Sequence, residues 1–89
     1  MAALDLLGRR WALRVLWELR SGPLTFRALR AACDGISPTV LNARLAELRE
    51  AGILGPGEDG YELTTSGREL YAALAPLQRW ANRWSSHSQ

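Results

Sequence analysis

Residues 35–54, GISPTVLNARLAELREAGIL, decide the fold, because they join a well-marked amphipathic helix to a short apolar strand. Ser37 is the predicted N-cap, since its hydroxyl can accept from a free backbone N–H, and Pro38 suits the first helical position, where no donor is needed. Gly52 predicts the end of the helix. The apolar residues at helical spacing are Leu41, Leu45 and Leu48, whereas Thr39, Asn42, Ala43, Ala46, Arg49 and Glu50 fall on the other face. One face packs, and the other faces outward.

Two shorter helices are predicted before this stretch, after one helical turn at residues 2–7, and a very short strand at Leu24 lies between these two helices. Thr25 is the expected N-cap of a helix that runs to about Ala32, and Gly35 lies in the next turn, where a left-handed backbone is often needed. Residues 25–51 therefore have the spacing of a helix-turn-helix. The expected inward residues are Trp11, Val15, Leu16 and Leu19 in a helix over residues 9–20, and Phe26 and Leu29 in the following helix, which turns Arg27 and Arg30 outward.

A β-hairpin, the wing, is predicted over residues 53–63. Ile53 and Leu54 are typical of a strand, Gly55 to Gly60 form a Pro/Gly-rich turn, and Tyr61 to Leu63 return. The chain is therefore predicted to be mainly α-helical with one small hairpin.

A long C-terminal helix is predicted over residues 65–85, followed by a frayed end. Ser66 and Glu69 have the spacing of a capping box, and Pro76 is expected to kink the helix. A dimerisation seam is predicted from apolar residues that recur by threes and fours, Leu70, Leu74, Leu77, Ala81 and Trp84, joined by Trp80 and, from the start of the chain, Trp11.

The composition indicates one globular domain, residues 1–89, that is soluble and cytoplasmic. Apolar residues make up 47% of the chain, but no apolar run is long enough to cross a bilayer, and no basic segment typical of a signal peptide opens the chain. One cysteine, Cys33, and one histidine, His87, exclude an intrachain disulfide and leave no zinc-ligand spacing. We expect no cofactor, no metal site and no enzyme activity, since no Ser, His and acid set is apparent.

Positive charge is concentrated in the first part of the chain. Residues 1–55 hold eight Arg and five acidic residues, whereas residues 56–89 hold three Arg and four acidic residues. All eleven basic residues are Arg, which contacts phosphate and guanine in bidentate fashion, but a G+C-rich genome explains the absence of Lys equally well.

The order of elements resembles the winged helix-turn-helix regulators of the HxlR type. Four stretches carry the resemblance in the same order: LDLLGRRWALRVLWEL, FRALRAACDGIS, SPTVLNARLAELREAGIL and YELTTSGREL. The resemblance implies a homodimeric transcription regulator whose terminal helices pair and whose two reading helices enter successive major grooves of a roughly palindromic operator.

Two departures from the family pattern are apparent. The family's N-terminal extension with a reactive cysteine is absent, and Cys33 matches an aliphatic position, so we expect Cys33 to pack in the core instead of sensing oxidants. The family's wing is usually longer and basic, whereas this turn carries Glu58 and Asp59, which would repel phosphate.

The predicted DNA contacts of the arginines each have an alternative. Arg27 and Arg30 suit phosphate contacts but equally an ordinary solvated surface. Asn42 is the best candidate to read a base, through adenine, while Thr39 or Ala43 can meet a thymine methyl group. Arg44 either contacts phosphate or forms an internal ion pair with Glu47 or Glu18. The predicted DNA-binding residues are Arg27, Arg30, Ser37, Thr39, Asn42, Ala43 and Arg44.

Two functions follow. The first is a sequence-specific DNA-binding regulator, in its simplest form a repressor, whose partners are double-stranded DNA and a second copy of the chain. The second is a winged helix that has weakened or lost DNA binding and instead binds a planar aromatic effector at a Trp-lined dimer seam. The four tryptophans, with Trp17 included, are expected either to line one shared cavity or to fill a dimer core.

Overall fold

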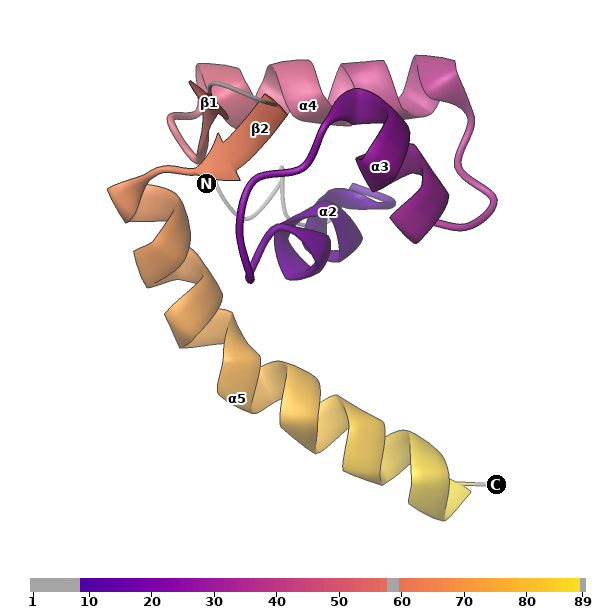
Figure 1. Cartoon of the computed structure of the whole chain (residues 1–89). Coiled ribbons are helices and arrows are strands. Elements are labelled where there is room, and N and C mark those ends of the chain that lie inside the picture. The colour runs from indigo at the N-terminus through magenta and orange to yellow at the C-terminus, as the bar shows by residue number, and fades with distance from the viewer. Residues whose placement is uncertain (1–8, 58–59, 89) are drawn as a thin grey trace.

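The computed structural model describes residues 9–57 and 60–88, so the turn predicted at residues 2–7 and the acidic pair Glu58 and Asp59 lie outside the described residues. The prediction of a mainly helical chain with one hairpin and a long last helix is confirmed. The elements are α2 (Ala12–Glu18), α3 (Phe26–Ala32), α4 (Pro38–Glu50), β1 (Leu54–Gly57), β2 (Gly60–Leu63) and α5 (Thr65–Ser88) (Figure 1).

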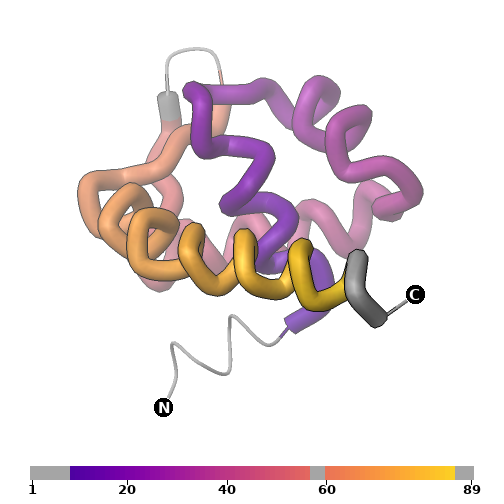
Figure 2. Tube along the Cα trace, turned by 90° about the horizontal axis from the view of Figure 1, so that it is seen from below, coloured from indigo at the N-terminus to yellow at the C-terminus, as the bar shows by residue number. Residues whose placement is uncertain are grey.

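The helix α2 lies at the centre of the fold and contacts α3, α4 and α5. Figure 2, a view from below, shows α5 crossing next to α2 on the underside of the helical cluster. The core is apolar throughout, and it contains no buried polar or charged residue among those described. Its fully or almost fully buried side chains include Val15, Leu16, Leu19, Leu29, Cys33, Leu41, Leu45 and Leu48.

The helix-turn-helix is confirmed in detail. The Thr25 hydroxyl accepts from the Ala28 N–H at 3.1 Å, and the Ser37 hydroxyl accepts from the Val40 N–H at 3.1 Å. Gly35 has a φ of 88°, in the left-handed region that glycine adopts without strain. Both helices therefore begin at the predicted caps, which satisfy free backbone donors locally.

The helix predicted over residues 9–20 is shorter than expected. Trp11 has a φ of 79°, which no α-helical residue adopts, so the helix begins at Ala12 and ends at Glu18. The Trp11 side chain is nevertheless half-buried against the core, as its place in the apolar stripe predicted.

The hairpin has longer strands and a shorter turn than the sequence predicted. Leu54 pairs with Leu63 and Gly57 pairs with Gly60, so most of the expected turn belongs to the strands. The short strand at Leu24 is confirmed, because its backbone exchanges hydrogen bonds of 3.0 and 2.8 Å with Tyr61. Gly60 makes this approach possible, since a Cβ there would lie 2.2 Å from the Leu24 carbonyl oxygen.

The start of α5 is fixed by Thr64 and not by the predicted capping box of Ser66 and Glu69. The Thr64 hydroxyl oxygen accepts from the Gly67 N–H at 3.0 Å and lies 2.6 Å from the Gly52 carbonyl oxygen, to which it donates. The Thr64 N–H donates to the Ile53 carbonyl oxygen at 3.0 Å. One threonine therefore joins the end of α4, the wing and α5.

The second half of α5 extends away from the rest of the molecule (Figure 1). The helix continues through Pro76 to Ser88, three residues beyond the predicted end. Leu70 and Leu74 are half-buried against the core, whereas Leu77, Trp80 and Trp84 are 52–59% exposed. The predicted seam therefore has two parts, one within the domain and one beyond it.

Replacement of Thr64 tests the junction. Thr64→Val keeps the shape of the side chain but removes the three hydrogen bonds of the hydroxyl, to the Gly52 and Ile53 carbonyl oxygens and from the Gly67 N–H, so we expect a loss of about 1–2 kcal/mol in the free energy of unfolding. Denaturant unfolding measures it. The matched control is Thr65→Val, at an exposed neighbouring position, which we expect to be close to neutral. Equal losses in the two variants would contradict this account of the junction.

Candidate nucleic-acid interface

The outward face of α4 begins with small polar side chains. Ser37, Thr39 and Asn42 are exposed and Ala43 is half-buried, while the three leucines on the opposite face are buried. Because the Ser37 cap holds the first turn, these side chains project from a fixed helix end. This arrangement allows short side chains to approach a surface closely, as reading base edges in a groove requires.

A groove of about 770 Å³ lies between α3 and the first turn of α4. Arg27 and Arg30 are exposed on its α3 side, and neither guanidinium forms an ion pair within residues 9–57 and 60–88. Asp34 is the acidic residue among those that line the groove, so its lining carries a net positive charge. The partial positive charge of the α4 N-terminus adds to it. The groove can therefore accept an anion such as phosphate.

Arg44 lies apart from these residues. Its side chain is only 16% exposed, and its Nη2 atom lies 3.4 Å from Glu47 Oε1. The structure thus contains the ion pair with Glu47 that was one of the predictions for Arg44. A phosphate contact would require this guanidinium to leave Glu47 and move outward.

The prediction that Cys33 packs in the core is confirmed. Its side chain is fully buried, and burial raises the pKa of the thiol, because the interior disfavours a thiolate.

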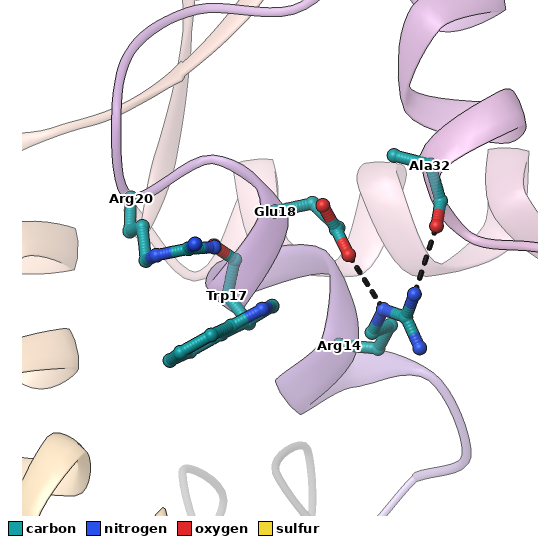
Figure 3. Close-up of polar contacts among 5 residues, drawn as sticks. All are labelled: Arg14, Trp17, Glu18, Arg20 and Ala32. Atoms are coloured by element: carbon teal, nitrogen blue, oxygen red, sulfur yellow. Dashed lines mark hydrogen bonds and ion pairs between the residues drawn. The ribbon is translucent and has the colours of Figure 1, made fainter.

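Nearby, Arg14 pairs with Glu18 at 2.7 Å and donates from Nη2 to the Ala32 carbonyl oxygen at 2.9 Å (Figure 3). Arg14 thereby holds the end of α3 against α2.

Within a single chain, the tryptophans do not line one shared cavity. Trp80 and Trp84 stack on each other in the exposed half of α5, with ring centroids 6.1 Å apart. Trp17 lies instead against Tyr71 at 6.3 Å, and the Arg20 guanidinium covers it at 3.8 Å (Figure 3). Trp11 packs on the core.

A smaller apolar pocket of about 170 Å³ lies between α2 and α5 and was missed by the sequence analysis. The sequence contains one signal for this pocket, because the spacing of Tyr71, Leu74 and Gln78 places their side chains on one face of a helix. Its lining residues are Leu13, Leu16, Trp17, Tyr71, Leu74, Ala75, Leu77, Gln78 and Ala81.

The described residues contain neither a group of His, Cys, Asp or Glu placed to hold a metal ion nor a helix long and apolar enough to cross a membrane.

A model of the HxlR-like helix-turn-helix matches residues 6–89. The chain belongs to the HxlR-like helix-turn-helix family. This finding confirms the resemblance in the sequence.

Individual relatives of this chain carry the names of helix-turn-helix transcriptional regulators. The uncharacterized HTH-type transcriptional regulator YvaP of Bacillus subtilis is 32% identical over 89 residues, which cover 92% of this chain and 82% of YvaP. Rv3095 of Mycobacterium tuberculosis, also an uncharacterized HTH-type transcriptional regulator, is 36% identical over 92% of this chain, which matches only 56% of that relative's length.

Solved structures support the fold. Quinone-bound YodB from B. subtilis has a TM-score of 0.82 and 33% identity, over 91% of this chain and 92% of that chain. A possible HxlR family transcriptional factor from Thermoplasma volcanium has a TM-score of 0.85 and 27% identity, over 93% and 81% of the two chains. The HxlR-like family and these relatives are transcriptional regulators and not enzymes.

Proposed function

We propose that this HxlR-like chain is a sequence-specific DNA-binding regulator that acts as a homodimer on a roughly palindromic operator, in its simplest form as a repressor in the cytoplasm. The observation that carries the proposal is the capped outer face of α4, where Thr39 and Asn42 are exposed next to the groove of Arg27 and Arg30. Arg27 and Arg30 contact phosphates, and Thr39, Asn42 and Ala43 read bases. Ser37 fixes the helix start at the DNA.

The homodimer is proposed from the exposed half of α5. The second half of α5 extends beyond the folded core and exposes the large apolar side chains of Leu77, Trp80 and Trp84. A second copy of α5 can cover them. Tryptophan is also a residue type enriched in interface hot spots. Two α4 helices related by a two-fold axis then face two half-sites.

A second candidate function is the binding of a planar aromatic effector. It is favoured by the pocket between α2 and α5, where Trp17 and Tyr71 provide aromatic faces and Gln78 an amide. A volume of about 170 Å³ suits a single ring, since an apolar cavity of about 150 Å³ holds benzene. The quinone-bound state of YodB makes a small planar ligand reasonable for this chain as well. The proposed effector site is therefore this pocket, which lies next to the dimer seam, and not the site predicted from the sequence at Trp80 and Trp84.

DNA binding is tested by separating base contacts from phosphate contacts. Asn42→Ala should relax preference at one base pair by about 1–3 kcal/mol while affinity for random DNA stays unchanged. Arg27→Ala should weaken binding to all sequences and reduce the magnitude of the salt slope of the dimer by about 1.8, because each protomer loses one phosphate contact. Titration of labelled duplexes at several salt concentrations measures both. Unchanged sequence preference in Asn42→Ala would exclude Asn42 as a reading residue.

The dimer is tested by sedimentation across a range of protein concentrations. We expect the unsubstituted chain to have twice its mass of 9.9 kDa, and Trp80→Ala to raise the dimer dissociation constant by about thirtyfold, the usual cost of truncating an aromatic hot spot. Arg79→Ala, an exposed neighbour, is the control. A monomeric chain, or equal behaviour of the two variants, would contradict a dimer held by α5.

Ligand binding is tested by titrating benzoate and benzamide while the tryptophan emission is followed. A ligand in the pocket should quench Trp17, so Trp17→Phe should abolish the response and Trp84→Phe should retain it. A response that survives Trp17→Phe, or none across the panel, would exclude this pocket as the effector site.

A further inference from the structure

Glu47, on α4, is the centre of an ionic cluster that neither the predicted DNA contacts nor the pocket uses. Its two carboxylate oxygens hold different guanidinium groups: Oε1 lies 3.4 Å from Arg44 Nη2, and Oε2 lies 3.3 Å from Arg9 Nε. Arg9 precedes α2, so the cluster links the segment before the central helix to the middle of the reading helix. One acid thus partners two of the eight arginines in the first 55 residues.

Burial makes the three groups depend on one another. The Arg44 side chain is 16% exposed and that of Glu47 is 30% exposed, whereas that of Arg9 is 56% exposed. Glu47 is the only carboxylate within ion-pair distance of Arg44 among the described residues. A guanidinium so far removed from water is stable only beside an opposite charge. Without Glu47, Arg44 would therefore turn outward to solvent or to any anion within reach.

The position of Arg44 gives this restraint a consequence for DNA binding. Arg44 follows Asn42 by two residues on the reading helix, and its long side chain can reach a phosphate once it leaves Glu47. Contacts to phosphate strengthen binding to all sequences alike, so every arginine withheld from the backbone lowers non-specific affinity without lowering base preference. Restraint of Arg44 and Arg9 therefore favours selectivity.

We propose that Glu47 is an internal counter-ion that holds Arg44 and Arg9 away from the DNA backbone, and thereby sets the ratio of specific to non-specific binding. Glu47 acts through the two arginines and not by contact with DNA, so it is a positioning residue. The inference rests on the proposed DNA-binding function and assigns to Glu47 the role of limiting non-specific affinity for DNA.

The test measures the salt dependence of binding to random duplex DNA by the full chain. Glu47→Gln should release Arg44 and Arg9, so the salt slope should steepen by about 0.9 for each new phosphate contact. For each new phosphate contact, the decrease in affinity for random DNA between 50 and 200 mM salt should become about 3.5-fold larger. The ratio of operator to random-DNA affinity should fall accordingly.

Glu50→Gln is the matched control. It makes the same change of charge on the same helix, but Glu50 is exposed and pairs with no arginine in the described part of the chain. We expect its salt slope to match that of the unsubstituted chain. Equal slopes for Glu47→Gln and Glu50→Gln would overturn the inference, because any effect would then come from net charge alone.

Arg9→Gln keeps the inference testable if Glu47→Gln does not fold. Arg9 is more than half exposed, and its removal leaves the pair of Arg44 and Glu47 in place. We expect an unchanged salt slope, because Arg9 is held by Glu47 and makes no phosphate contact. A slope reduced by about 0.9 per protomer would show that Arg9 already binds DNA and would overturn the inference.

Failure of the proposed function is distinguishable from failure of this inference. If the unsubstituted chain does not bind DNA at low salt, the DNA-binding function and the role of Glu47 are both wrong. If it binds with a measurable salt slope and the variants behave contrary to these expectations, only the role of Glu47 is wrong.

Discussion

The burial of one face of α4 is the constraint on which the rest of the structure depends. Leu41 and Leu48 are fully buried and Leu45 is 2% exposed, and each contributes about 1.5–3 kcal/mol relative to an exposed side chain. Rotation of α4 about its axis would expose all three, so the helix has one orientation, and Thr39 and Asn42 face outward in consequence. Through the Ile53 carbonyl group and Thr64, the end of α4 also fixes where α5 begins.

Charge on this chain is divided between two kinds of arginine. Arg27 and Arg30 border an open groove, whereas Arg9 and Arg44 are paired with Glu47. The wing sequence LGPGEDGYEL contains no basic residue, so the hairpin offers phosphate no countercharge. Arg49, on α4 itself, is exposed and, like Arg27 and Arg30, has no carboxylate partner within residues 9–57 and 60–88. Under the proposed function, selectivity depends on base contacts and on shape more than on attraction to the DNA backbone.

Interactions between near neighbours were predictable from sequence, and those between distant segments were not. The Ser37 and Thr25 caps act over three residues, so their residue types and the leucine spacing were sufficient to place α3 and α4. Thr64 bonds to residues 11 and 12 positions earlier, and no local pattern marks that junction. Helical spacing placed Leu70 and Leu74 on one face of α5, which packs on the core, but only the size of the domain shows where the core ends, after Leu74, and where exposed surface begins. The pairing of Arg44 with Glu47 was foreseen as one of two alternatives, since they are three positions apart on one helix. The second partner of Glu47, Arg9, depends on the packing of the N-terminal segment on α4.

The central claim is that the fixed outer face of α4 reads a DNA sequence as part of a dimer. Selection from a random duplex pool by the full chain, followed by sequencing of the bound fraction, tests it most directly. The account predicts enrichment of a roughly palindromic site with half-sites about 10 bp apart, one helical turn. The absence of enrichment at low salt would contradict it, and enrichment of a single half-site would contradict the dimer.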